Sequence, residues 1–403
     1  MLRLIVVEKL LSDHKIEFAH IKSGHETPKY AVACWAKGQP EDGWTNRDDE
    51  FTYQKCRQFE YGKIQPSQQL AFGKLTGAAK VAKGQGCDYI WIDHCCIDQS
   101  NAKDVEMSIN LRYQWYAEAE VCLVYLPDGM LSSDPCERLV LDVGIRVCRW
   151  FYTSWSTAVM LASKHINFYD RDWQQFGTIQ KQSSYEGRLE KFENEIQVIT
   201  SIHHKALSGS VPVSEYSVAA RISWARGPMG PSDFEQVEDL AYSLVGLFGV
   251  HLTPNYGEGG NMAFHRLAAK IMQSTSDLSI LSWEDDYAKG PLGALPYIPL
   301  GEAWGSCYNE FFPPVPSQHP LRMTEKGVRV TAVLYPVKTA EGDRYWMPLG
   351  NAKSGHSPGL LFQQIDKSTY QRTSKRRKTF DISELLPSPS PTTFHITTLA
   401  SLS

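Results

Sequence analysis

Long apolar runs are missing from this sequence. No uninterrupted hydrophobic stretch approaches the ~20 residues that a membrane-spanning helix needs. The opening MLRLIVVEKLL is too short for the core of a signal peptide, and acidic Glu8 interrupts it. We therefore expect an intracellular, cytoplasmic protein with no membrane partner.

The chain also lacks an excess of charge. Its 41 basic and 45 acidic side chains leave a formal net charge of −4. Non-specific binding of polyanions needs a broad basic field, which this balance does not supply. We expect no nucleic-acid partner. One basic cluster, Lys375–Lys378, is either a nuclear-localisation signal or a solvated loop.

Signatures of metal, disulfide and phosphate sites are absent as well. The nine cysteines are scattered, whereas disulfide frameworks occur in small domains with even cysteine counts. The sequence has no pair of CxxC elements and no HExxH, so we predict no metal site. It also lacks the GxxxxGK[ST] pattern of a phosphate-binding loop. Most of the cysteines are expected to pack as small buried hydrophobic residues.

The sequence does contain short apolar runs separated by helical patterns. With 42% hydrophobic and 11% aromatic residues the composition is that of a folded protein. Runs of strand length occur at 30–35, 89–92, 121–125 and 166–169, and helical periodicity occurs at 68–83, 102–120 and 150–163. Strands that alternate with helices predict an α/β fold with an open, doubly wound parallel sheet.

Three regions follow from these patterns. Residues 1–180 are predicted as the α/β core and residues 181–290 as a mainly helical region, with helices over 183–205, 237–249 and 261–275. Residues 291–403 are predicted as a β-rich C-terminal region with a Ser/Pro-rich tail, in which Val328–Val333 is one strand. The fold prediction is therefore an α/β core, a helical extension and a small β-rich region.

The segment YIWIDHCCIDQSNAKDVEMSINLRYQWYAEAEVCLVYLPD, residues 89–128, strongly resembles the heterokaryon-incompatibility (HET) domain family of filamentous fungi. Further matches follow the family's order, among them YAVACW, WFYTSW, INFYDRDW, RISWA, EDLAYSLVGLFGV and SDLSILSW. The resemblance extends over roughly residues 1–283. It implies a cytoplasmic role in self/non-self recognition and programmed cell death. It also implies a core distantly similar to Toll/interleukin-receptor (TIR) domains, which have a flavodoxin-like sheet.

The same resemblance bears on catalysis. Some TIR domains cleave NAD with a glutamate in a W-x-x-x-E-L pattern, and HET domains usually carry a similar motif. Here the pattern begins at Trp155 and reads WSTAVM, so Val159 stands at the glutamate position. A valine cannot stabilise an oxocarbenium-like charge as a carboxylate does. We therefore predict that the family glutamate is absent and assign no catalytic residue, while NAD stays open as a ligand.

Candidate ligand contacts gather at the carboxyl ends of the predicted strands, where open parallel sheets bind ligands. The candidates are Cys34, Trp35, Asp93, Cys95, Cys96, Asp98, Trp155 and Asp170. Each has a structural alternative: the aspartates can cap turns or helices, Asp98 or Ser100 can cap the helix beginning near Ala102, and the cysteines and tryptophans can pack in the core. Both interpretations stay open at this point.

The sequence thus favours incompatibility-type signalling and cell-death control. The expected partners are other HET, TIR-like or incompatibility proteins, a second copy of the chain, and a small molecule in a cleft. One alternative is a HET scaffold that acts as an enzyme on a small molecule in fungal secondary metabolism. A second is NAD cleavage by a displaced carboxylate, with Glu137 and Asp142 as candidates.

Overall fold

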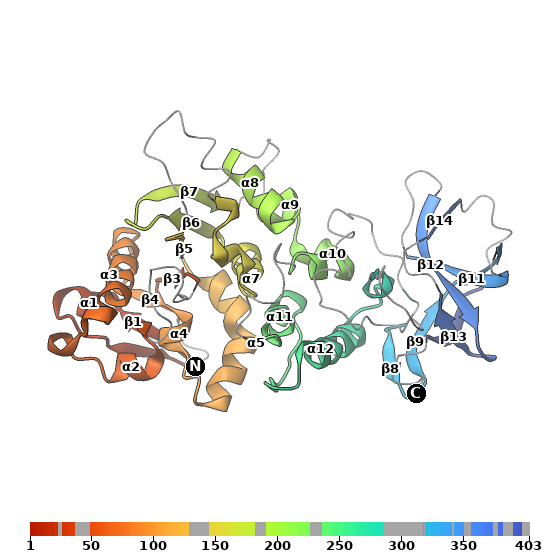
Figure 1. Cartoon of the computed structure of the whole chain (residues 1–403), viewed down its shortest axis with the longest axis horizontal. Coiled ribbons are helices and arrows are strands. Elements are labelled where there is room, and N and C mark those ends of the chain that lie inside the picture. Colours follow the sequence, from red (N-terminus) through yellow and green to blue (C-terminus); the bar gives the residue numbers. More distant parts are fainter. Residues whose placement is uncertain are drawn as a thin grey trace. The chain divides into compact units, whose positions relative to one another are not determined.

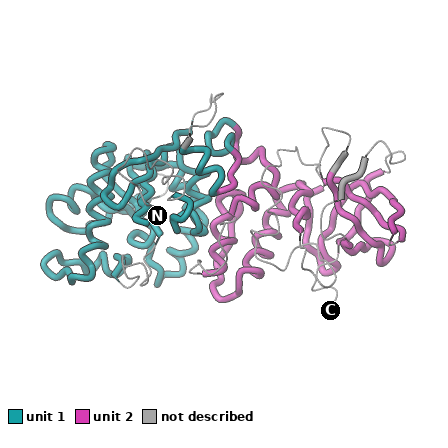
Figure 2. The backbone as a smooth tube through the Cα atoms, turned by 45° about the horizontal axis from the view of Figure 1, so that its top comes forward, with its two compact units in different colours: residues 1–199, 204–210 teal, residues 200–203, 211–403 magenta. Residues whose placement is uncertain are grey.

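The computed structural model divides the chain into two compact units (Figure 2). The first contains residues 1–199 and 204–210, and the second contains residues 200–203 and 211–403. The structure describes residues 1–22, 26–36, 49–128, 145–181, 191–225, 236–284, 317, 319–340, 342–349, 356–373, 378–381 and 390–396. The division of the chain into three regions at 180 and 290 stays a prediction.

The first unit alternates strands and helices along the chain (Figure 1). Its strands are β1 (Leu2–Val6), β2 (Phe18–Ile21), β3 (Tyr30–Cys34), β4 (Tyr89–Trp91), β5 (Val121–Tyr125), β6 (His165–Tyr169) and β7 (Gln175–Gln180). Its α-helices are α1 (Val7–Ser12), α2 (Tyr53–Arg57), α3 (Gln69–Gly84), α4 (Asp93–Cys96), α5 (Ala102–Glu118), α7 (Ser156–Ala162), α8 (Lys191–Thr200) and α9 (His204–Leu207). Short 3₁₀ turns occur at η3 (Tyr61–Lys63), η4 (Pro66–Gln68) and η6 (Arg149–Tyr152).

The strands described in this unit form one sheet in the order β2-β1-β4-β3-β5-β6-β7. The four central strands, β4, β3, β5 and β6, are mutually parallel. Strands β1 and β7 join them antiparallel, and β2 pairs antiparallel with β1. The chain runs from β3 to β4 on one side and then returns to β5 on the other side. This reversal is the flavodoxin-like order, and it places the ligand-binding edge at the carboxyl ends of β3 and β5.

Helices cover both faces of this sheet. Helix α1 packs against α3, and α5 packs against α7. Figure 1 shows the first pair on one side of the sheet and the second pair on the other. Right-handed crossovers require this arrangement, because the connection from β3 to β4 runs opposite to those that lead to β5 and β6. Burial on both faces explains why all of Val121–Tyr125 is buried.

The prediction of an open α/β sheet is confirmed, with differences in detail. The run at 121–125 is a strand with the predicted bounds, and the other three predicted strands differ by one residue at an end. The predicted helix over 150–163 is instead the turn η6 followed by the shorter helix α7. The antiparallel strands β1, β2 and β7 were not among the predictions.

The second unit begins with short helices and ends with a second sheet. Its helical segments are η7 (Val213–Glu215), α10 (Val218–Ser223), α11 (Asp239–Tyr242), η9 (Gly246–Phe248), α12 (Gly260–Ser274) and η10 (Leu278–Leu281). Its strands are β8 (Arg322–Thr324), β9 (Gly327–Ala332), β10 (Tyr335–Thr339), β11 (Gly342–Pro348), β12 (His356–Gln364), β13 (Thr369–Arg372), β14 (Lys378–Asp381) and β15 (Thr392–Ile396). They form a separate sheet in the order β10-β11-β12-β13-β15-β9-β8, with β14 paired to β12. This sheet confirms the predicted β-rich C-terminal region.

A buried carboxylate organises the helical part of the second unit. Glu238 is buried, and its Oε1 accepts hydrogen bonds from the amides of Gly257 at 2.9 Å and Gly259 at 2.8 Å. Both glycines have positive φ angles, 94° and 84°, which L-residues with side chains rarely adopt. The sequence motifs around Glu238 and Gly257 are thus two halves of one structural contact.

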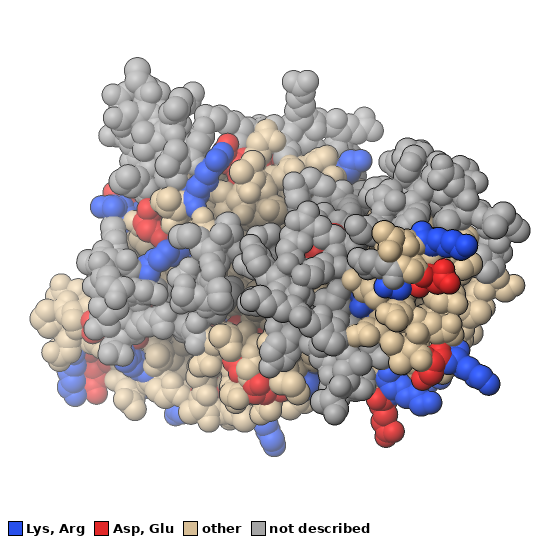
Figure 3. All heavy atoms as spheres, turned by 45° about the vertical axis from the view of Figure 1, so that its right-hand side comes forward, with Lys and Arg blue, Asp and Glu red and all other residues tan. Residues whose placement is uncertain are grey.

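No helix within the described ranges is both long and apolar enough to span a bilayer. On the face shown in Figure 3, the described acidic and basic side chains are interspersed.

Candidate functional site

The carboxyl ends of β3 and β5 are occupied by aromatic side chains. Trp35 directly follows β3, and its ring centroid lies 6.3 Å from that of Tyr125 at the end of β5. The imidazole of His94, just after β4, meets Trp35 edge-on with centroids 5.1 Å apart. Trp173 also stacks on Tyr125, with ring centroids 4.6 Å apart. These contacts bring together residues from four consecutive strand ends, as the fold predicts.

Charged side chains lie next to the rings of Trp35 and His94. The Nζ of Lys74, on α3, is 2.6 Å from Oε1 of Glu50, and both side chains are only 4% exposed. Oε2 of Glu50 lies 3.9 Å from His94 Nε2. The Lys74 ammonium also lies 6.0 Å from the centre of the Trp35 ring. We call Glu50, Lys74, Asp93 and His94 the buried charge cluster.

Asp93 orients His94 within this cluster. Its Oδ1 accepts a hydrogen bond from the His94 backbone amide at 2.7 Å and lies 2.8 Å from the ring Nδ1. A carboxylate at this distance accepts a hydrogen bond from a proton on Nδ1, so Asp93 fixes the orientation of the imidazole ring. The His94 side chain is 5% exposed, while that of Asp93 is 36% exposed. Asp93 is therefore the most exposed member of the cluster.

Two buried polar atoms at this position have no hydrogen-bond partner among the described residues. They are Trp35 Nε1 and His94 Nε2. Buried polar groups in folded proteins are almost always hydrogen-bonded, so such atoms commonly mark a site that a ligand or an ordered water completes. Two of them on neighbouring rings make this the strongest candidate site in the first unit.

The candidate cysteines have structural roles. Cys95 Sγ donates to the Phe51 carbonyl at 3.0 Å, and Cys96 Sγ accepts from the Ile92 amide at 3.4 Å. Cys34 Sγ lies 3.8 Å from Cys122 Sγ. Burial raises the pKa of all three candidate thiols, so few of them are thiolates near neutral pH. This chemistry does not suit a nucleophile.

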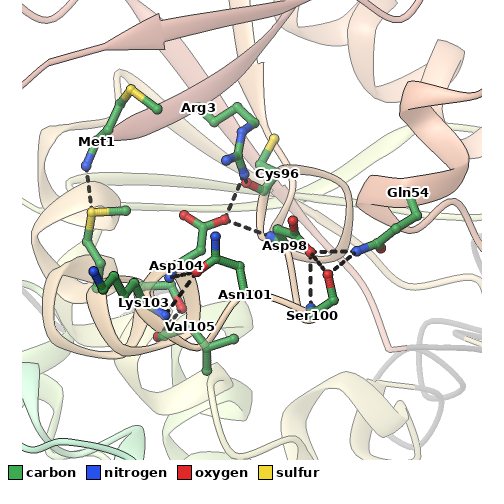
Figure 4. Close-up of polar contacts among 12 residues, drawn as sticks. Met1, Arg3, Gln54, Cys96, Asp98, Ser100, Asn101, Lys103, Asp104 and Val105 are labelled. Carbon is green, nitrogen blue, oxygen red and sulfur yellow. Dashed lines mark hydrogen bonds and ion pairs between the residues drawn. The ribbon is translucent and has the colours of Figure 1, made fainter.

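Asp98 belongs to the turn before α5, as Figure 4 shows. Its Oδ1 accepts hydrogen bonds from Gln54 Nε2 and, at 2.6 Å, from the Ser100 hydroxyl, which lowers the pKa of Asp98. The sequence suggested Asp98 or Ser100 as the N-cap of α5, but neither residue has this role. The N-cap is Asn101, whose Oδ1 accepts from the amides of Lys103 and Asp104.

Arg3 ties strand β1 to this turn (Figure 4). Its guanidinium donates to the Cys96 carbonyl and forms an ion pair of 2.9 Å with Asp104. Asp104 in turn accepts from the Asp98 amide at 2.8 Å. The guanidinium also lies 4.2 Å from the centre of the Tyr53 ring. The network fixes the α4–α5 connection through a residue at the start of the chain.

The remaining two candidates have contacts of their own. Trp155 directly precedes α7, and the guanidinium of Arg112 lies 3.8 Å from the centre of its ring. Asp170 accepts from the amides of Asp172 and Gln174, each at 2.9 Å, which closes the turn between β6 and β7. Val159 is buried within α7. Glu137 and Asp142, the displaced carboxylates considered above, lie outside the described residues.

Of the candidate contacts, the structure therefore brings together Trp35 and Asp93. It adds His94, Glu50, Lys74 and Tyr125, which were not among the candidates. One signal could have revealed Lys74. It stands three residues after Ala71 and four before Ala78, on the buried face of α3, where a lysine is unusual. Glu50 has no comparable periodic context.

Comparison with known proteins identifies the region in which these residues lie. The family model described as "Heterokaryon incompatibility protein (HET)" matches residues 34–188. This segment is a HET domain. It contains Trp35, Tyr125 and all four members of the buried charge cluster. No solved structure matches the chain significantly.

A curated relative supports the assignment over a longer segment. The chain is 32% identical over 221 residues to "Vegetative incompatibility protein HET-E-1" of Podospora anserina. The matched segment covers 54% of this chain and 15% of the relative. The similarity is therefore that of a shared region within a much longer protein.

The cluster is not arranged as a metal centre. Within the described ranges, no three or more His, Cys, Asp or Glu side chains converge in a way that could hold a metal ion. Lys74 also supplies a positive charge directly beside Glu50. The arrangement can instead bind and orient a small polar group through hydrogen bonds.

Proposed function

We propose that this protein acts in heterokaryon incompatibility, where its HET domain signals non-self recognition and triggers cell death. The similarity to a vegetative incompatibility protein supports the proposal, because it covers more than half of this chain. The trigger and the partners belong to the proposal too. We expect association with another HET, TIR-like or incompatibility protein, or with a second copy of the chain, in the cytoplasm.

The buried charge cluster is the observation that links the proposed function to a particular site in the HET domain. An ion pair as buried as Lys74–Glu50 costs desolvation energy, and well-packed apolar residues would often be as stable. Ionisable groups kept in such an environment at the ligand edge of an α/β sheet point to function. We assign the signalling activity of the HET domain to this cluster.

Inducible expression in a filamentous fungus tests the proposal. The double variant Glu50→Gln/Lys74→Met removes both charges at nearly constant volume and should still fold. Lys80→Met, on an exposed position of the same helix, is the matched control. Wild type and Lys80→Met should kill the cells, as measured by uptake of a vital dye, whereas the double variant should not. Survival of cells that express folded wild-type protein would overturn the proposal.

A second measurement separates signalling by association from signalling by NAD cleavage. With Val159 at the position of the family glutamate, we expect purified protein to release no nicotinamide from NAD. Release that the double variant lacks would instead assign the cluster a hydrolytic role. The cell-death result tests the signalling proposal in either case.

A further inference from the structure

Arg112 is a buried arginine whose charge has no counter-ion among the described residues. It lies on the buried face of α5 and is only 6% exposed. Its Nε is buried without a hydrogen-bond partner, and no described carboxylate forms an ion pair with its guanidinium. An arginine stays charged at every physiological pH. Burying a charge without a partner is unfavourable, so this side chain lacks an anion.

Two other buried arginines show how this protein otherwise treats such a charge. Arg3 forms an ion pair of 2.9 Å with Asp104. The guanidinium of Arg372 donates hydrogen bonds to two backbone carbonyls. Each of these side chains therefore has oxygen acceptors within the fold. Of the three arginines that the structure describes as buried, only Arg112 has none.

Aromatic rings hold the Arg112 side chain in place. Its guanidinium lies 3.8 Å from the centre of the Trp155 ring and 6.0 Å from that of Trp91. Such contacts attract the positive charge but offer no oxygen to the N–H groups. Trp155 is partly exposed, so the pair of Arg112 and Trp155 reaches the surface of the first unit. A ligand can therefore approach the guanidinium from outside.

The guanidinium group itself defines what would bind. Its five N–H donors lie in one plane in a fixed fork, which matches the two oxygens of a carboxylate or a phosphate. An oxyanion supplies both the missing acceptors and the missing negative charge. A neutral ligand supplies acceptors alone, and a cation is repelled.

We propose that Arg112 and Trp155 form a binding site for a small ligand that carries an oxyanion, either a phosphate or a carboxylate. The guanidinium donates two parallel hydrogen bonds to the oxyanion, and the indole of Trp155 keeps the guanidinium in position. This site includes no member of the buried charge cluster. It concerns binding alone and does not depend on the role in incompatibility.

Nuclear magnetic resonance on the full chain with ¹⁵N-labelled arginine tests the proposal. The Nε–H signal of Arg112 is identified as the one that Arg112→Lys removes, or Arg112→Met if the lysine variant does not fold. The probes are inorganic phosphate and acetate at millimolar concentrations and constant ionic strength. Tetramethylammonium chloride is the cationic probe. At least one of the two anions should shift the Arg112 signal saturably, and the tighter-binding anion identifies the ligand chemistry.

Thermal denaturation gives a second readout, because a ligand that binds the folded state raises the melting temperature. Arg112→Lys keeps the charge but lacks the fork, so it should bind the anion roughly tenfold more weakly and gain less in melting temperature. Arg57→Met is the matched control, since Arg57 is an exposed arginine 5.9 Å from the centre of the Tyr53 ring. Its gain should equal that of the wild type.

Three results would contradict the proposal. The first is an Arg112 signal that neither anion shifts, which would mean that water alone solvates the guanidinium. The second is a shift caused by tetramethylammonium. The third is an equal gain in melting temperature for the wild type and Arg112→Lys, which would place the anion elsewhere on the protein.

Discussion

Lys74 is a lysine whose charged side chain is buried in the first unit. Its ammonium is buried against Glu50 with 4% of the side chain exposed. Removing one partner leaves the other charge buried without its compensation. We predict that Lys74→Met lowers the free energy of unfolding by about 3–5 kcal/mol, measured by urea denaturation.

Two comparisons make this prediction specific. Lys80→Met, at an exposed position of the same helix, should change the unfolding free energy by less than about 0.5 kcal/mol. The double variant Glu50→Gln/Lys74→Met should recover much of the loss, because it removes both charges. A double variant as unstable as Lys74→Met would show that the pair is not the cause.

Cysteine reactivity tests the structural role of the adjacent thiols. Cys95 and Cys96 are buried, and burial raises the pKa of each thiol above its usual range. Since the thiolate is the reactive form, both should resist iodoacetamide at pH 8 in the folded protein and react in urea. Mass spectrometry of the labelled peptides measures this. Rapid labelling of Cys95 in the folded state would reopen its role as a nucleophile.

At the scale of elements, helix α3 contains a matched pair of glycines. A β-carbon on Gly77 would collide with the indole of Trp173, whereas one on Gly73 would meet no atom within 4 Å. Gly77→Ala should therefore destabilise the protein by about 1–3 kcal/mol through overpacking. Gly73→Ala should stabilise it by up to about 1 kcal/mol, because alanine favours the helix.

Thermal denaturation of the two variants gives the test. Their melting temperatures should move in opposite directions, although the substitution and the helix are the same. Equal shifts in melting temperature would mean that helix propensity determines both effects and that Trp173 does not contact α3 at Gly77. The comparison therefore reports on how the loop after β6 packs next to the aromatic residues of the site.

Helix α4 shows why the site was only partly predictable. Its four residues, Asp93–Cys96, form one turn, with Cys96 N bonded to the Ile92 carbonyl at 2.8 Å. The sequence predicts polar residues at the end of β4. It does not tell which side chains point to the ligand edge, because that depends on the turn. The turn directs His94 to Trp35 and places the two thiols in the core.

At the scale of the whole molecule, the segment that matches the HET family model is shorter than the segment that forms the first sheet. The match begins at Cys34, the last residue of β3. Strand β1, which pairs with β4 and carries Arg3, lies before it. Leu4 and Ile5 of this strand are fully buried. The matched segment alone therefore lacks part of its own core.

We predict that a fragment of residues 1–210 folds cooperatively and that a fragment of residues 34–188 does not. The longer fragment keeps all the described strands of the first sheet, and the shorter one loses β1, β2 and most of β3. Circular dichroism and the thermal transition of each fragment measure this outcome. Equal transitions in both would show that β1 is dispensable.

The sequence by itself determined the central strands, the helices between them and the β-rich C-terminal region. Their apolar periodicity is a local pattern, so it can be recognised in the sequence without knowledge of the fold. It did not separate β1 from α1, because Leu4–Val7 is one continuous apolar run that a strand and a helix share. Periodicity cannot divide such a run.

Only the tertiary structure decided which charged residues meet. Glu50 and Lys74 are 24 positions apart, and His94 is 20 positions beyond Lys74, yet crossovers of the sheet bring all three to the same strand ends. Sequence spacing carries no information on such long-range contacts. Burial, which sets the energies of these charges, exists only once the chain has folded.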